Sequence, residues 1–125
     1  MNKNVLIDSH ILIWLLYEPE KIGPKSKEIL KAADKVYVSV VTLWELALKF
    51  KVHKLAYSPV EFIKGVTVLN LEKLNVQDNH IVELLSVSLP RKDPFDTLLV
   101  AQAKAENCIF ITADQNILRS QVRFR

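Results

Sequence analysis

The chain is poor in glycine and cysteine, and each shortage excludes a class of function. Its 125 residues include two glycines, at positions 23 and 65. A phosphate-binding loop needs several glycines close together, so neither a P-loop nor a dinucleotide-binding fingerprint can be formed. The one cysteine, Cys108, excludes a disulfide framework and a zinc site built on cysteines. Chemistry in this protein must therefore rest on other side chains.

Long hydrophobic runs are also missing. The longest uninterrupted apolar stretch, Ile11 to Leu16, is far too short to span a bilayer. The N-terminus reaches an acidic residue at position 8, so it lacks the apolar region of a signal peptide. These features favour a cytoplasmic protein that does not enter a membrane.

The composition is that of a globular protein with a slight basic excess. Half of the residues are hydrophobic, a quarter are charged, and the net charge is +3. A chain of this length is expected to form one domain over residues 1–125. Candidate contacts for a phosphate backbone are Lys49, Lys51, Lys54 and Arg91. On charge alone, however, an ordinary solvated surface explains these cations more simply.

Short apolar runs alternate with helical patterns along the whole chain. The runs predict strands at 4–7, 36–39, 66–69 and 108–111, with a possible fifth strand at 122–124. Helices are predicted at 9–17, 24–33, 42–52, 59–65, 76–87 and 94–106. Ile81, Leu84 and Leu85 are expected on one face of their helix, and Trp14 and Trp44 are expected in the core rather than as platforms for base stacking. This alternation predicts a three-layer α/β/α fold around a parallel sheet of about five strands.

Four acidic residues follow or adjoin these apolar runs. They are Asp8, Glu45, Asp96 and Asp114. Strand C-termini and the following helix N-termini share one edge of a parallel sheet, so distant acids can meet there. Carboxylates held together repel one another unless some are protonated or a cation lies among them. Oxygen-only ligation suits Mg²⁺ or Mn²⁺, which points to metal-dependent chemistry on phosphate.

Helix capping explains each acid equally well when the acids are taken singly. Asp8 precedes a predicted helix and can cap it. Thr42 and Glu45 match the two ends of a capping box. Asp93, followed by a proline, is explained completely as an N-cap, with Asp96 at the third helical position. The shared placement beside strand ends favours a common site, and capping and metal binding are compatible.

At these residues the chain resembles a known family, the PIN domains, and in particular the VapC-type ribonuclease toxins of type II toxin–antitoxin pairs. The similarity spans nearly the whole chain, in the order of the family's motifs. The matching segments are Val5-Leu6-Ile7-Asp8-Ser9-His10, Val41-Thr42-Leu43-Trp44-Glu45-Leu46-Ala47-Leu48-Lys49, Asp93-Pro94-Phe95-Asp96-Thr97-Leu98-Leu99-Val100-Ala101-Gln102-Ala103 and Ile111-Thr112-Ala113-Asp114.

The resemblance implies a strand order of 3-2-1-4-5 and endonucleolytic cleavage of RNA with Mg²⁺ or Mn²⁺. It implies a homodimer and inhibition by a cognate antitoxin. By motif match, the catalytic and metal-binding quartet is Asp8, Glu45, Asp96 and Asp114, with Thr112 and Asp93 in support.

Two other functions remain compatible with the sequence. A receiver-like phosphoacceptor domain has a similar size, but it needs paired acids after the first strand, where Asp8 is followed by Ser9. A catalytically silent interaction module, in which the acids only cap helices, is the second alternative. Saturable stabilisation by a divalent ion distinguishes a binding site from such a module.

Overall fold

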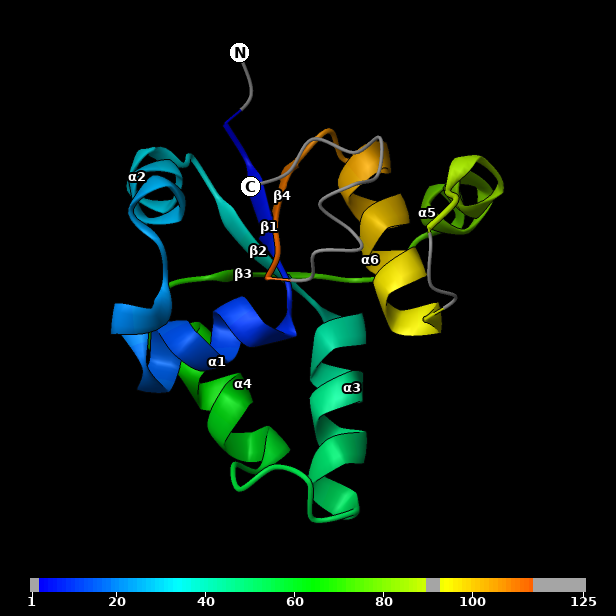
Figure 1. Ribbon diagram of the computed structural model, residues 1–125. Helices are drawn as coiled ribbons and strands as arrows, with labels where there is room; N and C mark the ends of the chain where they lie inside the picture. The colour runs from blue at the N-terminus through cyan, green and yellow to red at the C-terminus, as the bar shows by residue number, and fades with distance from the viewer. Residues whose placement is uncertain (1–2, 90–92, 114–125) are drawn as a thin grey trace.

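A four-stranded parallel sheet lies at the centre of the computed structural model, which describes residues 3–89 and 93–113. The strands are β1 (Val5–Ile7), β2 (Val36–Ser39), β3 (Glu72–Leu74) and β4 (Ile109–Ile111). Their order across the sheet is β3-β2-β1-β4 (Figure 1). All three pairings are parallel, as expected when each strand is followed by a helical crossover.

The direction in which the chain adds strands to the sheet reverses at β1. The chain moves outward from β1 to β2 and then β3, before crossing to the other side of β1 to form β4. Ile7 pairs with Ile111, so the residues that follow these two strands emerge side by side. A reversal of this kind opens a crevice at the carboxyl ends of the two central strands.

Helices cover both faces of the sheet (Figure 1). They are α1 (Ser9–Tyr17), α2 (Pro24–Ala32), α3 (Val40–Lys51), α4 (Pro59–Val68), α5 (Asp78–Glu83) and α6 (Pro94–Ala105), with 3-10 turns η1 (Pro19–Lys21) and η2 (Leu84–Ser86). Helices α5 and α6 lie on one side and α1, α2 and α4 on the other, while α3 contacts α1, α4 and α6. Within the part of the chain that the structure describes, no helix is long and apolar enough to cross a membrane.

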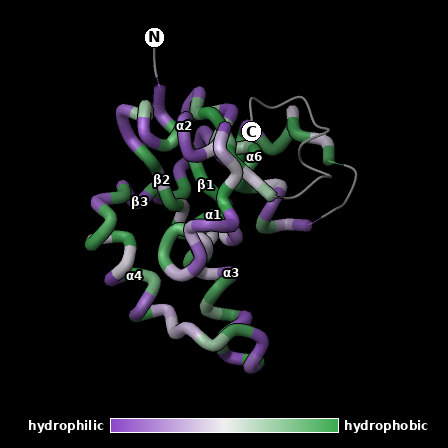
Figure 2. The backbone as a smooth tube through the Cα atoms, turned by 60° about the vertical axis from the view of Figure 1, so that its left-hand side comes forward, coloured by the Kyte–Doolittle hydropathy of each residue, from purple (hydrophilic) through white to green (hydrophobic). Residues whose placement is uncertain are grey.

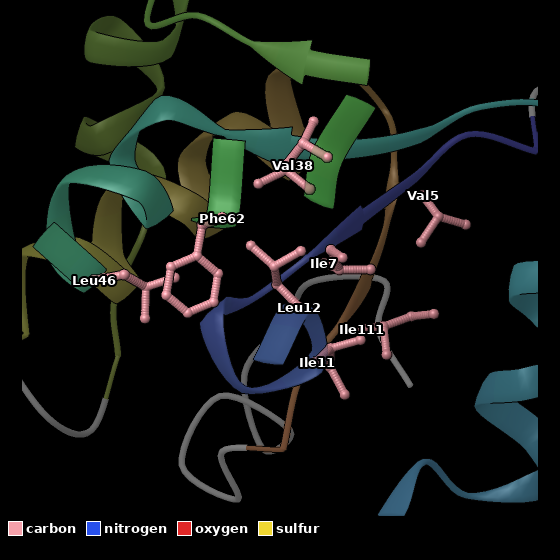
Figure 3. Close-up of a cluster of buried hydrophobic side chains, with 9 residues drawn as sticks. Val5, Ile7, Ile11, Leu12, Val38, Leu46, Phe62 and Ile111 are labelled. Atoms are coloured by element: carbon pink, nitrogen blue, oxygen red, sulfur yellow. The ribbon is translucent and has the colours of Figure 1, made fainter. Parts of the chain in front are cut away.

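The sheet separates two hydrophobic clusters, as the alternation of β1 requires. Leu6 faces the cluster beneath α6, whereas Val5 and Ile7 face the cluster beneath α1 and α4. Figure 3 shows the second cluster, in which Phe62 and Leu46 reach toward the strand side chains. In Figure 2 the hydrophobic colour runs through β1 in the middle of the molecule. Burial on both faces accounts for strands that read as continuous apolar runs.

Helix α4 approaches α1 closely at Gly65. A Cβ atom at this position would lie 2.6 Å from Leu16 Cδ2 and 3.2 Å from Leu16 Cγ. The whole end of the Leu16 side chain would have to move to accept it. Glycine at this position therefore leaves room for Leu16 to pack over α4, although glycine in a helix costs about 1 kcal/mol relative to alanine.

Most predicted elements are confirmed, including the parallel sheet and the order of its first four strands. The described residues contain four strands rather than about five; the predicted strand at 122–124 lies outside them. The predicted strand at 66–69 is wrong, because α4 continues to Val68 and β3 is Glu72–Leu74. Val66 lies one turn after Phe62, so both are buried on the same helical face.

One predicted helix and one predicted buried side chain also differ from the structure. The predicted helix at 76–87 is a short α5 followed by η2, and Ile81 and Leu85 point to solvent, with Leu85 91% exposed. The buried residue of α5 is His80 instead. Trp14 is partly buried against the core, but Trp44 is 58% exposed. Helical periodicity located an apolar stripe in each case, and the packing of neighbouring helices decided which stripe was covered.

Candidate active site

Asp8 lies at the carboxyl end of β1, where it caps α1 and is almost completely buried. The residue is 4% exposed. Oδ1 accepts a hydrogen bond from the Ile11 amide at 2.9 Å, as the capping interpretation predicted. Oδ2 accepts hydrogen bonds from the Thr112 hydroxyl and, at 3.2 Å, from the Ala113 amide. Asp8 is therefore held from both sides by the segments that follow β1 and β4.

Burial raises the pKa of the Asp8 carboxyl above its ordinary value of 3.8. Loss of solvation is the largest cause, and the hydrogen bonds from Thr112, Ile11 and Ala113 act in the opposite direction without cancelling it. A buried carboxylate with a raised pKa is an unfavourable charge in the protein alone. A bound cation at this position would favour the ionised form.

Glu45 projects from the second turn of α3, and its side chain is not explained by capping. The helix begins at Val40 and is capped by Ser39, whose hydroxyl accepts from the Val41 amide at 3.0 Å. The predicted capping box between Thr42 and Glu45 is therefore wrong, because Thr42 is already inside the helix. Glu45 Oε2 pairs with Lys49 Nζ at 3.2 Å. Among the described residues its other oxygen, Oε1, is buried with no hydrogen-bond partner.

Asp93 and Asp96 lie together at the start of α6. Asp93 is the N-cap, and its Oδ1 accepts from the amides of Phe95 at 2.9 Å and Asp96 at 3.2 Å. The capping interpretation of Asp93 is confirmed. Asp96 occupies the first turn, where the partial positive charge of the helix N-terminus favours a carboxylate.

These side chains line one pocket of about 350 Å³. Its walls are Asp8, Ser9, His10, Glu45, Lys49, Asp93, Asp96 and Ala113. Three of the four predicted acids thus reach one cavity, Asp8 from the end of β1, Glu45 from α3 and Asp96 from α6. Asp114, the fourth, and Arg91 lie outside the described residues. The predicted Lys51 and Lys54 instead line a neighbouring groove of about 470 Å³, which shares Glu45, Lys49 and Asp93 with the pocket.

The pocket has the chemistry of a site for a hard cation. Carboxylate oxygens are the ligands that Mg²⁺ and Mn²⁺ prefer. A positive charge bound in the pocket would give the unpartnered buried oxygen of Glu45 a partner and would offset the cost of burying Asp8. As placed within residues 3–89 and 93–113, no three histidine, cysteine or acidic side chains stand close enough to share one ion. The acidic side chains of the pocket fit Mg²⁺ or Mn²⁺ by the type of their ligand atoms and by their burial.

Sequence reasoning did not find the polar network that connects α3 to α6. The Ser39 hydroxyl donates to Gln102 Oε1 at 2.5 Å, although both residues are completely buried. His80 Nδ1 accepts from the Gln77 amide at 3.0 Å, so its ring proton is on Nε2 and is donated to Glu106. Gln102 Nε2 lies 3.4 Å from the same Nδ1. The one available signal was a glutamine on the apolar face of a predicted helix.

Comparison with known proteins identifies the family. The PIN domain model matches residues 5–121, and the chain belongs to the PIN domain family. Ribonuclease VapC22 from Mycobacterium tuberculosis is 24% identical over 116 residues, covering 90% of this chain and 88% of that protein. The resemblance to VapC-type proteins is thereby confirmed.

Solved structures share the fold at lower identity. DNA-bound VapBC from Salmonella typhimurium matches with a TM-score of 0.68 and 16% identity, over 100% of this chain and 98% of that one. A toxin–antitoxin complex from Klebsiella pneumoniae matches with a TM-score of 0.64 and 18% identity, over 97% and 95%. The observed strand order also argues against a receiver-like domain, because flavodoxin-like sheets place the first strand beside the third.

Proposed function

We propose that the protein is a metal-dependent endoribonuclease and the toxin of a type II toxin–antitoxin pair. The observation that carries the proposal is the convergence of Asp8, Glu45 and Asp96 on one pocket from the end of β1, from α3 and from α6. Three buried or half-buried acids in one cavity are costly for stability alone, which favours a functional reason for them. The similarity to ribonuclease VapC22 supports ribonuclease as the activity.

The acidic residues have distinct roles in this proposal. Asp8, Glu45, Asp96 and Asp114 hold Mg²⁺ or Mn²⁺. When bound, the ion supplies the Lewis acidity that activates water and offsets charge on the phosphate in the transition state. Thr112 orients the Asp8 carboxylate through its hydroxyl. Asp93 fixes the first turn of α6 and so positions Asp96.

The proposal extends to the binding partners. Lys49, Lys51, Lys54 and Arg91 contact the phosphate backbone of the RNA. A cognate antitoxin inhibits the enzyme, as the solved toxin–antitoxin complexes of similar fold suggest by analogy. The active form is a cytoplasmic homodimer.

The test is cleavage of defined RNAs by the wild-type protein and by Asp96→Asn. Wild type should cut in Mg²⁺ or Mn²⁺, and the variant should not, because its carboxylate ligand is lost. Asp78→Asn, an exposed acid in the first turn of α5, is the matched control and should cut normally. Sequencing the ends should show 5′-phosphate and 3′-hydroxyl groups. Cyclic 2′,3′-phosphate ends, or full activity in EDTA, would contradict the proposal.

A further inference from the structure

We propose that the face of α3 beside the acidic pocket binds a single-stranded RNA segment and stacks one unpaired base on Trp44. The surface concerned, called the α3 groove below, is the groove lined by Leu48, Lys49, Lys51, Val52, Lys54 and Phe95, together with Trp44, which adjoins it through its ring contact with Phe95. The inference deepens the proposed function and rests on it, because it assigns the part of the substrate that flanks the cleaved phosphate.

Trp44 exposes much of its surface to solvent while it contacts Phe95. Its side chain is 58% exposed, although tryptophan is highly buried in most proteins. The edge of one ring meets the face of the other between Trp44 and Phe95, with centroids 4.9 Å apart and planes at 62°. This contact holds the indole without covering it. An ordered and exposed aromatic plane is what base stacking needs.

The aromatic pair adjoins the pocket that contains the acids. Trp44 directly precedes Glu45 on α3, and Phe95 directly precedes Asp96 on α6. The cavity in the α3 groove, of about 470 Å³, has Glu45, Lys49 and Asp93 in common with the acidic pocket. A polymer bound at the pocket therefore has a continuous path along α3.

The charge of the groove suits a polyanion. Lys49, Lys51 and Lys54 line it, and its carboxylates, Glu45 and Asp93, stand only where it joins the pocket. Lys51 and Lys54 are exposed, whereas Lys49 is partly engaged by Glu45. Phosphates next to a group of carboxylates are repelled, so cations along the approach are required to hold the strand.

A single strand fits the combination better than a duplex or an apolar peptide does. The bases of a duplex are already stacked on one another, and only an unpaired base can stack on a protein side chain. An apolar peptide would use Leu48 and Val52 but would leave three lysines without a role. Lysines and an exposed indole on the same face are together typical of single-strand binding.

The experiment measures binding of a fluorescent single-stranded oligoribonucleotide in EDTA, where the proposed nuclease does not cut. Trp44→Leu, which keeps an apolar side chain without an aromatic face, should lower affinity about 10-fold. Trp44→Phe should retain most of the affinity. Leu85→Ala removes an even more exposed apolar side chain outside the groove and should have no effect. Affinity for duplex RNA should be the same for all four proteins.

Two further measurements keep the test decisive. Lys51→Ala and Lys54→Ala should each reduce the slope of log affinity against log salt by about 0.7, whereas Lys27→Ala on α2 should not. An abasic site moved along the oligonucleotide should weaken binding to wild type at one position only, which requires no variant to fold. The inference would be overturned if no abasic position weakened binding, or if Trp44→Leu and Leu85→Ala bound RNA with equal affinity. Either result would favour a protein partner for this face.

The same proteins separate this inference from the proposed function. RNA cleavage that depends on Asp96, together with binding that is indifferent to Trp44, would retain the nuclease and reject the α3 groove. Binding that depends on Trp44 without cleavage in Mg²⁺ or Mn²⁺ would reject the nuclease and retain a single-strand binding surface.

Discussion

At the scale of single residues, Asp8 is both a helix cap and a buried carboxyl, and only the first role is needed by the helix. It caps α1 and is also buried in the acidic pocket. Capping would be satisfied at a solvent-exposed position, where burial does not raise the pKa of a carboxyl. The burial of Asp8 therefore has a cost that the helix itself does not require, and this cost can be measured.

Asp8 predicts a specific pH dependence of stability in the absence of divalent ions. Because the pKa of Asp8 is raised in the folded chain, its carboxyl keeps a proton in the folded chain at pH values where it has lost one in the unfolded chain. The contribution of Asp8 to the free energy of unfolding therefore falls as the pH rises through its folded pKa. Urea unfolding of wild type and Asp8→Asn in EDTA, between about pH 4 and pH 7, measures the difference.

The unfolding free energy of wild type minus that of Asp8→Asn should decrease as the pH rises. The contributions of the other titrating groups are the same in both proteins and cancel in this difference. Asp34→Asn, an exposed acid outside the pocket, is the control and should give a flatter difference. A difference for Asp8 that increases with pH would mean that hydrogen bonding to the carboxylate outweighs the loss of solvation, which would contradict the prediction.

At the scale of elements, the relative position of α3 and α6 decides the distance between Glu45 and Asp96. The buried bond between Ser39 and Gln102 connects the N-terminus of α3 to the middle of α6. Ser39 also caps α3, so one hydroxyl orients the helix and ties it to its neighbour. The bond between Ser39 and Gln102 would therefore help to position Glu45 and Asp96, although it involves neither acid.

The bond predicts coupled losses of stability. Gln102→Met keeps the volume but leaves the Ser39 hydroxyl without its buried acceptor, and it should cost about 1–3 kcal/mol of unfolding free energy. Ser39→Ala should cost a similar amount, partly through loss of the cap. The double variant should lose less than the sum, with a coupling of at least about 0.5 kcal/mol by thermal or urea unfolding. Additive losses would show that the two side chains stabilise the chain independently.

At the scale of the whole molecule, the pocket joins segments that are far apart in the sequence. Asp8 and Thr112, which are hydrogen-bonded, are separated by 104 positions. A ligand that binds this pocket therefore connects both ends of the described chain, and its binding energy should appear as global stability. A catalytically silent module would show no such linkage.

Titration with Mn²⁺ should raise the midpoint of thermal unfolding in a saturable manner. At a free ion concentration about 100 times the Kd, the expected gain in unfolding free energy is about 2.7 kcal/mol. Asp8→Asn and Glu45→Gln should reduce the gain, and Glu28→Gln, an exposed acid on α2, should not. An identical, unsaturable shift in all four proteins would reflect a general salt effect and favour the silent module.

Local sequence determined much of the architecture. The sheet at β1, β2 and β4 is covered on both faces, and short apolar runs of this kind are recognisable as strands from the sequence. Asp8 and Asp93 were recognisable as caps because a cap depends on the next few residues only. The edge strand β3 was misplaced, since Glu72 and Lys73 are exposed and one buried residue, Leu74, gives no periodic pattern.

The sequence by itself determined the parallel α/β fold and the position of Asp8 between a strand and the helix it caps, because both depend on local hydrophobic patterns and helix starts. Only the tertiary structure decided that Glu45 is no cap, that Trp44 is exposed and that Ser39 meets Gln102. These facts depend on which helix faces pack against each other. Packing is set by side chains tens of residues apart, and a local pattern does not specify it.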